Sequence, residues 1–397
     1  MKQFMLEDLK PFTFRTPRIV FKRESWKDLP KICAEFGEKG LLVTGTTLKD
    51  KSGIYPELMN EFEAKNLVVE EITRKGGEPT VTEVDTLAGE LREEDQRVDW
   101  VLGIGGGSTL DLAKSAAGLS RNEGSAAEYQ QGKDLITEGI TFIAVPTTAG
   151  TGSEITNNAV LINEATHAKL SIRGDKMMAK VAVFDPVLTV SMSPETTAYS
   201  GTDALVQAIE AYVSKASISI TDLLAEKAIE IIAGVLPIVY QDGQDIIARE
   251  QMLYGSVLSA LSFSNAKLGA VHGFAHPIGA LFNKPHGMIC GILLPHIMRF
   301  NLDGELPDVI RKFAWIGRTL QKPALDGEVS DIEMANMAIT KIQELLAALA
   351  IPAKLSEIGL TADDIPAIVA DTKGSSLANN PRDTSKELLE QILTVAM

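Results

Sequence analysis

The run Gly103-Ile-Gly105-Gly106-Gly107-Ser108-Thr-Leu-Asp111-Leu-Ala-Lys114 decides the fold of the first half of the chain. It follows the apolar segment Trp100-Val-Leu and opens a helical pattern, so three consecutive glycines lie at a strand-to-helix turn. Glycines let the backbone approach a bound group closely, and free N–H groups at a helix N-terminus attract an anion such as pyrophosphate. Ser108 and Asp111 have the spacing of a capping box. The alternative is a tight turn that binds no ligand, since the run is neither GxGxxG nor a P-loop.

Strands and helices alternate on both sides of this turn. Short apolar runs at 40–44, 67–72, 100–103 and 141–145 predict strands, and the spacing of apolar residues predicts helices at 25–36 and 81–94. Residues 12–22 mix aromatic and β-branched side chains with polar ones, which indicates an early extended or hairpin segment. The alternation predicts an α/β domain with a mostly parallel sheet.

A second polar loop, Pro146-Thr-Thr-Ala-Gly150-Thr-Gly-Ser-Glu154, directly follows the strand predicted at 141–145. It would supply hydroxyl and free N–H groups at the carboxyl edge of the sheet, where open α/β folds bind their ligands. Two such loops at one edge support a common binding site.

The pattern of apolar residues in the sequence changes near residue 190. Strand patterns end, and amphipathic helical patterns follow at 196–213, 221–240, 248–264, 332–350 and 386–396. Asp185-Pro186 and Ser193-Pro194 mark the boundary. We therefore predict two domains: a Rossmann-like α/β domain over 1–190, whose glycine turn suits the pyrophosphate of a dinucleotide, and an all-α domain over 191–397 that contains a cluster of histidines.

Three of the five histidines in the chain lie between residues 268 and 286, in an apolar setting. His272 and His276 are one helical turn apart, although Pro277 fits poorly within a helix. His286 follows the turn signal Asn283-Lys-Pro285 and could fold back towards His272. Each could be an independently satisfied core histidine, but their clustering favours a metal, a carboxylate or a reacting group as the common partner.

Asp203 and Gln207 share one face of a predicted helix, among Ala, Leu, Val and Ile residues. A carboxylate on an apolar face is costly unless it is paired or binds a metal. The alternative is a helix N-cap at Thr202 or Asp203. Beside the clustered histidines, a metal site is the better interpretation.

Composition excludes several classes of protein. The formal net charge is −15, without a basic stripe, so nucleic acid and anionic membranes are poor partners. Cys33 and Cys290 lack CxxC spacing, which indicates neither a disulfide framework nor a thiolate metal site. The N-terminus does not resemble a signal peptide, and no apolar run reaches the length of a membrane span. We expect a cytoplasmic protein.

Four motifs in the expected order resemble the iron-containing (group III) alcohol dehydrogenase family. They are the glycine turn with Asp111 and Lys114, the loop 146–154, Gly201-Thr-Asp203-Ala-Leu with Glu210, and His272-x3-His276 with Asn283-x2-His286-Gly. The resemblance implies a dehydroquinate synthase-like architecture: an N-terminal nucleotide-binding α/β domain with a parallel sheet, an all-α C-terminal domain, and an active site between them.

The resemblance also implies a divalent metal, Fe(II) or Zn(II). Asp203, His272 and His286 match three of the family's ligands, an Asp and three His, and Gln207 stands where the fourth ligand, a His, is usual. An amide oxygen is a weaker donor than imidazole, so Gln207 would lower the affinity or favour other ions. His276 is a non-ligand in the family pattern and the candidate proton relay.

The activity implied is hydride transfer between a nicotinamide cofactor and a small alcohol or aldehyde. The cofactor contacts would come from Gly45, Gly106, Gly107, Ser108, Asp111, Thr147, Thr148, Asn158 and Lys169, although Lys169 could equally be a solvated surface residue. Family members that favour NAD typically carry an Asp at the position of Gly45. Without that charge, and with Thr46 and Thr47 following, we predict that NADP(H) is accepted and preferred to NAD(H), unless Gly45 is only a turn glycine.

Three other functions stay open at this point. They are a metal-independent reductase of the maleylacetate reductase type, a lyase resembling dehydroquinate synthase, and a non-catalytic nucleotide-binding protein. The lyase needs several basic residues, and the region offers mainly Lys267 and Lys284. Phe263, Phe274 and Phe282 could line a substrate pocket or belong to the core. A homodimer is expected, with residues 12–22 as a possible part of the interface.

Overall fold

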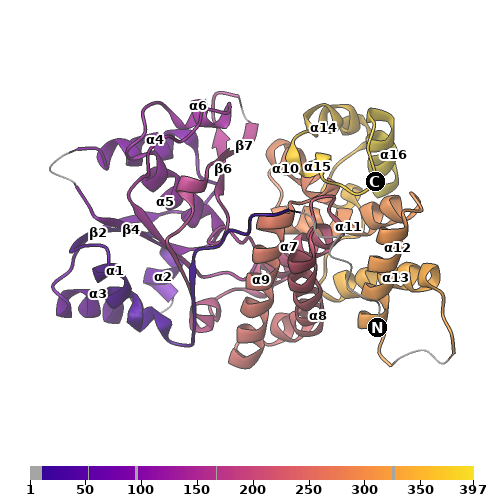
Figure 1. The fold of residues 1–397 in the computed structure, drawn as a ribbon, viewed down its shortest axis with the longest axis horizontal. Helices are drawn as coiled ribbons and strands as arrows, with labels where there is room; N and C mark the ends of the chain where they lie inside the picture. Colours follow the sequence, from indigo (N-terminus) through magenta and orange to yellow (C-terminus); the bar gives the residue numbers. More distant parts are fainter. Residues whose placement is uncertain (1–10, 52, 94–96, 167, 324–326) are drawn as a thin grey trace.

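The chain folds into an α/β part and a helical part that lie side by side (Figure 1). The computed structural model describes residues 11–51, 53–93, 97–166, 168–323 and 327–397. In Figure 1 the α/β part is coloured indigo to magenta and the helical part red to yellow. Within the described residues, no helix is both long and apolar enough to cross a bilayer.

A fully parallel six-stranded sheet forms the centre of the α/β part, in the order β1-β8-β5-β4-β2-β3. Its strands are β1 (Arg18–Phe21), β2 (Lys39–Gly45), β3 (Val68–Arg74), β4 (Trp100–Gly105), β5 (Thr141–Pro146) and β8 (Val181–Phe184). The helices of this part are α1 (Leu29–Ala34), α2 (Thr46–Lys51), α3 (Tyr55–Ala64), α4 (Val81–Glu90), α5 (Gly107–Leu119) and α6 (Ala126–Gln130).

Both faces of this sheet are buried, which explains the uninterrupted apolar runs of its strands. In β4, Val101 packs with α4 and α5 on one face, whereas Trp100 and Leu102 pack with α1 and α3 on the other. Successive side chains of a strand point to opposite faces, so one apolar run supplies two cores. The prediction of a parallel α/β sheet is confirmed.

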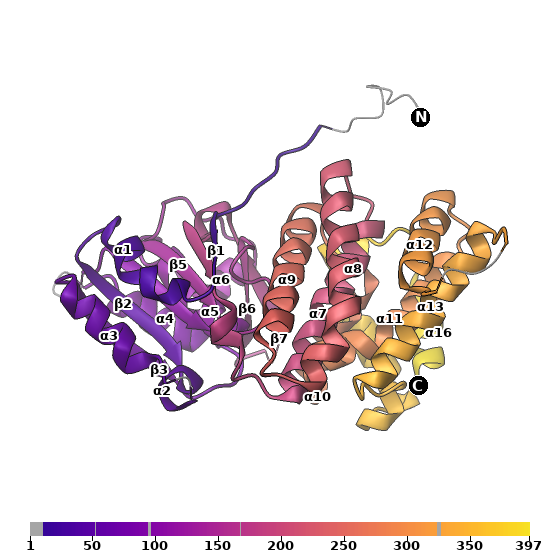
Figure 2. The ribbon, with the colours of Figure 1, turned by 90° about the horizontal axis from the view of Figure 1, so that it is seen from below.

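The helical part is built around α7, which is buried along most of its length between α8, α9 and α11 (Figure 2). Its helices are α7 (Pro194–Val213), α8 (Ser219–Gln241), α9 (Ile246–Ala266), α10 (Ala270–Phe282), α11 (His286–Leu302), α12 (Pro307–Leu320), α13 (Asp331–Ala348), α14 (Ile365–Asp371), α15 (Ser375–Ala378) and α16 (Lys386–Ala396). The expectation that strand patterns end near residue 190 is confirmed, because β8 is the last strand of the described chain. The domain boundary at 190/191 stays a prediction.

Several local predictions differ from the structure. Of the two alternatives for residues 12–22, the extended segment is confirmed and the hairpin is wrong, because residues 18–21 form the single edge strand β1, parallel to β8. A two-stranded antiparallel ribbon, β6 (Asn158–Asn163) with β7 (Ala168–Arg173), and the strand β8 were not predicted. The capping box at Ser108 is wrong: α5 has Gly106 as its N-cap, with no side-chain cap. Pro277 lies inside α10 despite its missing N–H group.

Candidate metal and nucleotide site

One face of α7 carries the polar side chains of the site. Asp203, Gln207 and Glu210 are four and three residues apart, so they lie on the same side of the helix over two turns. All three are buried, and α7 begins at an N-cap formed by Ser193, ten residues earlier. The alternative in which Thr202 or Asp203 caps the helix is therefore wrong.

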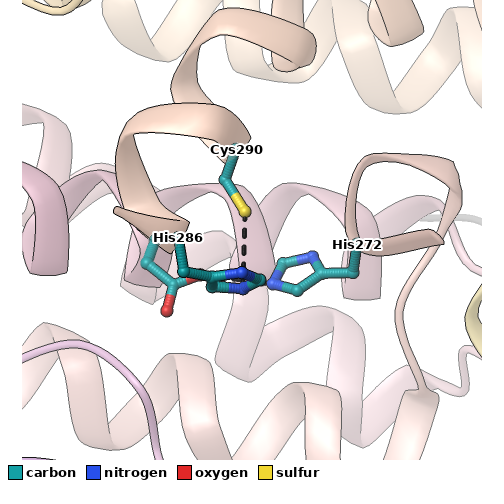
Figure 3. Close-up of side chains that lie close together, drawn as sticks. His272, His286 and Cys290 are labelled. Atoms are coloured by element: carbon teal, nitrogen blue, oxygen red, sulfur yellow. Dashed lines mark hydrogen bonds and ion pairs between the residues drawn. The ribbon is translucent and has the colours of Figure 1, made fainter. Parts of the chain in front are cut away.

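The histidines approach this face from two consecutive helices. His272 and His276 lie on α10, and His286 is the first residue of α11. The chain reverses between the helices at Asn283, which adopts the left-handed conformation with φ 49°. The ring centroids of His272 and His286 are 5.3 Å apart, and those of His276 and His286 are also 5.3 Å apart. The three histidines predicted to gather do so, and Figure 3 shows how the rings of His272 and His286 approach each other.

His272 is held between two carboxylates. Its Nδ1 lies 2.6 Å from Glu210 Oε2, and its Nε2 lies 3.2 Å from Asp203 Oδ1. The second oxygen of Glu210 accepts the backbone N–H of Val271 at 2.6 Å. Glu210 thereby fixes the rotation of the ring and directs Nε2 towards Asp203. A histidine that binds a metal usually has its other ring nitrogen held in this way.

The role of Glu210 was missed from the sequence, although the residue was part of the family motif. The sequence did contain a signal for this role. Glu210 is seven residues after Asp203 on the predicted helix, so the two side chains would lie on the same face, two turns apart.

The charges around the histidines differ sharply. Burial alone would lower the pKa of His272, but Glu210 and Asp203 raise that pKa to about 10. Burial and the neighbouring His272 hold the pKa of His286 well below its ordinary value. Burial, His286, His272 and the cations Lys169 and Arg173 do the same to the pKa of His276. In this surrounding, His276 and His286 are neutral near pH 7.

Four donor atoms converge on one point. A carboxylate oxygen of Asp203, ring nitrogens of His272 and His286, and Cys290 Sγ all lie within 4.8 Å of one another. His286 Nε2 is 3.8 Å from Asp203 Oδ1 and 3.6 Å from Cys290 Sγ. Two donors bound to one tetrahedral zinc-type ion, at about 2.0–2.3 Å each, lie roughly 3.3–3.7 Å apart. The donor set therefore fits a divalent transition metal.

Cys290 lies among these donors, although the spacing of the cysteines in the sequence did not indicate a thiolate metal site. It lies on α11 four residues after His286, so its side chain returns to the same face of the helix (Figure 3). Burial, Asp203 and Glu210 raise the pKa of the thiol well above its ordinary value. A bound cation reverses that effect, since a coordinating thiol loses its proton. The His286-x3-Cys290 spacing was the signal that sequence reasoning missed.

Gln207 is a further candidate ligand at this site, for a different reason. It is 3% exposed, it lines the cavity beside the histidines, and its Oε1 has no hydrogen-bond partner among the described residues. A buried carbonyl oxygen without a partner is costly, and a cation would satisfy it.

The glycine turn lines the same cavity as His286 at the start of α11. A Cβ atom at Gly105 would lie 2.6 Å from Thr109, and one at Gly107 would lie 2.7 Å from Thr151, so both positions require glycine. The free N–H groups at the start of α5 remain available to an anion, because no side chain caps them.

Two cavities meet at this turn, and together they contain most of the predicted cofactor residues. Gly107, Ser108, Asp111, Asn158 and Lys169 line the larger cavity, together with Asp203, Gln207, His272, His276 and His286. Gly45, Gly106 and Thr147 line a second cavity, at the carboxyl ends of β2, β4 and β5. Thr148 borders the turn, 3.5 Å from where a Cβ of Gly106 would lie.

Two cofactor candidates are already engaged by the protein. Asp111 accepts hydrogen bonds from Ser153 Oγ and from the backbone N–H of Val160. Lys169 forms an ion pair with Glu78 at 2.7 Å, and its side chain is only 11% exposed, so it is not the solvated surface lysine of the alternative interpretation. Both still border the cavity.

The three phenylalanines have different positions. Phe263 lines the larger cavity, whereas Phe274 is fully buried and Phe282 packs against the helical core. Only Phe263 can therefore contribute to a substrate pocket.

Comparisons with known proteins agree with this geometry. Residues 16–186 match the iron-containing alcohol dehydrogenase family, and residues 197–397 match the C-terminal part of the Fe-containing alcohol dehydrogenase family. The chain is 34% identical over 357 residues to 1,3-propanediol dehydrogenase of Citrobacter freundii, which covers 89% of this chain and 90% of that protein. It is 29% identical over 385 residues to the NAD-dependent methanol dehydrogenase of Bacillus methanolicus, covering 97% and 99%. A crystal structure of a 1,3-propanediol oxidoreductase superposes with a TM-score of 0.91 at 31% identity, covering 98% of this chain and all of that one.

Proposed function

The chain belongs to the iron-containing alcohol dehydrogenase family, and we propose that it interconverts a small aldehyde and its alcohol at the cluster of Asp203, His272 and His286. It is a metal-dependent alcohol dehydrogenase that uses a nicotinamide cofactor. The observation that carries the assignment of the site is the chain of contacts from Glu210 through His272 to Asp203, with His286 3.8 Å from the same carboxylate oxygen.

Asp203, His272 and His286 would hold the divalent ion, and two further donors face the same point. Cys290 Sγ would add a soft ligand that suits Zn(II), whereas Gln207 Oε1 would add a neutral oxygen that suits Fe(II). When bound, such an ion supplies Lewis acidity, which polarises an aldehyde oxygen or lowers the pKa of an alcohol.

The side chains of this protein position the reactants and handle the proton. A bound nicotinamide cofactor would supply the hydride for the carbonyl carbon and would itself be oxidised, and the oxygen of the aldehyde would need a proton to give the alcohol. His276 is the proposed proton relay, because it lines the cavity and its ring stacks on that of His286 at 15° between planes. A neutral imidazole can accept the proton of an alcohol near neutral pH.

The nucleotide would extend from the cavity at Gly45 across the glycine turn to the histidines. The interpretation of Gly45 as a mere turn glycine loses support, because its φ is not in the left-handed region and a Cβ there would lie an ordinary 3.6 Å from Thr109 Oγ1. An aspartate would therefore fit. Its absence leaves room for a 2′-phosphate beside Thr47, and supports NADP(H) as the preferred cofactor.

A cytoplasmic homodimer completes the proposal. Both cysteines are free and buried, as in a reducing compartment. The edge strand β1 pairs on one side only within the described chain, which leaves its outer edge available to a second subunit.

Initial rates of aldehyde reduction with NADH and NADPH test this function, using butanal and 3-hydroxypropanal as substrates. We expect turnover with both cofactors, and a higher kcat/KM with NADPH. Absence of turnover with every combination, in protein that contains metal, would contradict the proposal. Turnover with a preference for NADH would contradict only the assignment of Gly45.

A further inference from the structure

Two cations at the larger cavity have no partner. Arg173 is the last residue of β7, and Lys267 is the residue that ends α9. Both line the cavity that contains the histidines. Across the described residues, neither side chain forms a hydrogen bond or an ion pair. In a chain of net charge −15, with 53 acidic residues available, two unpaired cations in one cavity need an explanation.

The other charges of this cavity are already balanced. Lys169 pairs with Glu78 at 2.7 Å, and Lys114 pairs with Asp111 at 3.4 Å. Asp203 belongs to the histidine cluster. Asp175, the carboxylate that raises the pKa of Lys267, is shared between Arg15 at 2.8 Å and Asn157 at 2.8 Å. Arg173 and Lys267 therefore leave two uncompensated positive charges.

These two charges are close enough to repel each other. Removal from water is the main reason that the pKa of Lys267 is lowered, and the cations Arg173 and Arg15 lower it further. Loss of hydration also lowers the pKa of Arg173. An anion bound between them would remove both penalties. Lys267 moreover has φ 68° and ψ 175°, a backbone conformation that residues other than glycine rarely adopt and that is costly for lysine.

The two cations share their cavity with the histidines and with apolar and hydroxyl side chains. Lys267 directly precedes Leu268, which lines the cavity, and is five residues before His272. Phe263 and three serine hydroxyls, those of Ser171, Ser264 and Ser376, line the same region. Gly107 and Ser108 of the glycine turn line this cavity as well, whereas Gly45 and Gly106 line the second cavity, which neither Arg173 nor Lys267 lines.

We propose that Arg173 and Lys267 bind the anionic group of the substrate, so that this enzyme acts on a short aldehyde or alcohol bearing a carboxylate, sulfonate or phosphonate. The inference rests on the proposed function and narrows its substrate class. Arginine offers a planar fork that matches such oxyanions, and lysine adds a second point charge. The apolar side chains of Phe263 and Leu268 would contact the short carbon chain between the anion and the carbonyl group.

Pairs of aldehydes with and without the anion test this proposal. 4-Oxobutanoate is compared with butanal, and sulfoacetaldehyde and phosphonoacetaldehyde with propanal, each as kcat/KM at low and high salt. We expect the anionic member of at least one pair to be preferred by roughly 10- to 100-fold, as for hydrogen bonds to charged groups. The preference should shrink with salt. The three anions distinguish the carboxylate, sulfonate and phosphonate possibilities.

The variants Arg173→Gln, Lys267→Met and their combination should each reduce this preference, and the double variant should abolish it. Lys31→Met is the matched control, because it removes one exposed lysine from α1, outside the cavity, and should leave the preference unchanged. Equal losses for the neutral and the anionic aldehyde would contradict the proposal, since they would indicate a structural role for the cations.

A binding measurement keeps the test independent of turnover. Succinate, propane-1-sulfonate and propylphosphonate carry the anion without a carbonyl that can be reduced, and at least one should raise the Tm of the wild type but not of the double variant. If none raises it and no anionic aldehyde is preferred, the inference is wrong while reduction of butanal still supports the proposed function. If no aldehyde is reduced but the Tm shift is present, the proposed function fails and the anion site stands.

Discussion

Replacing Glu210 with glutamine tests the contact that orients His272. The carboxylate accepts two hydrogen bonds of 2.6 Å, one from His272 Nδ1–H and one from the backbone N–H of Val271. An amide of the same shape has only one oxygen, so its NH2 group must face one of these two donors. Either the imidazole loses its fixed orientation, or the buried N–H of Val271 loses its acceptor.

The expected size of the effect follows from this conflict. Loss of the residue that orients a metal-binding histidine usually weakens metal affinity by about 10- to 100-fold. That range corresponds to roughly 1.4–2.7 kcal/mol of metal-binding free energy. A separate cost in the free energy of unfolding of the metal-free protein, about 1–3 kcal/mol, is expected if Val271 N–H is left without a partner.

Competition with a chelating dye measures this affinity directly, with Zn(II) or Co(II) as the probe. Glu226→Gln is the matched control, because Glu226 accepts one hydrogen bond of 2.6 Å from Tyr212 Oη and lies on α8 outside the cavity. We expect Glu210→Gln to lose at least about 10-fold in metal affinity. A loss of no more than about twofold, equal to that of the control, would refute the reasoning.

Three further predictions follow from other contacts. Cobalt-loaded wild type should show a sulfur-to-cobalt charge-transfer band in the near ultraviolet that Cys290→Ser abolishes; no band in the wild type would leave Gln207 as the fourth donor. Gly45→Asp should lower the ratio of kcat/KM for NADPH to that for NADH by about tenfold or more, and an unchanged ratio would mean that this position does not contact the ribose. Burial raises the pKa of Glu154 from 4.5 to about 7, so the stability that its protonated form contributes is present below pH 4.5 and is lost as pH rises to 7. Between pH 4.5 and 8, the free energy of unfolding of Glu154→Gln should therefore rise by about 3 kcal/mol relative to that of the wild type, as measured by denaturant unfolding. A difference that stays constant with pH would contradict this.

Much of the fold could be predicted because single residues report their environment clearly. The apolar run of β4 is typical of a strand buried on both faces. The glycines after it are typical of a turn that lies close to another chain segment, which is the loop containing Thr151. The helix 386–396 agrees with α16 because its apolar residues recur at helical spacing. The hairpin β6–β7 was missed because its side chains are only partly buried, so that its pattern is weak.

The site was harder to predict where its geometry depends on tertiary packing. Asp203 and the histidines were recognisable as chemically expensive residues in apolar surroundings. Glu210 and Cys290 were not singled out, since their roles appear only when α7, α10 and α11 are packed together. The pairing of Lys169 with Glu78, 91 residues apart, and the unpaired state of Arg173 and Lys267 likewise depend on the folded charges.

The most direct test of the central claim, that a metal held by Asp203, His272 and His286 serves an alcohol dehydrogenase, is the rate of aldehyde reduction before and after chelation. The protein is treated with a chelator under anaerobic conditions, dialysed, and supplied with Fe(II) or Zn(II), with Asp203→Asn measured in parallel. We predict that activity disappears on chelation, returns with one of the two ions in the wild type, and does not return in the variant. A rate unaffected by removal of the metal would contradict the account and would indicate a metal-independent reductase.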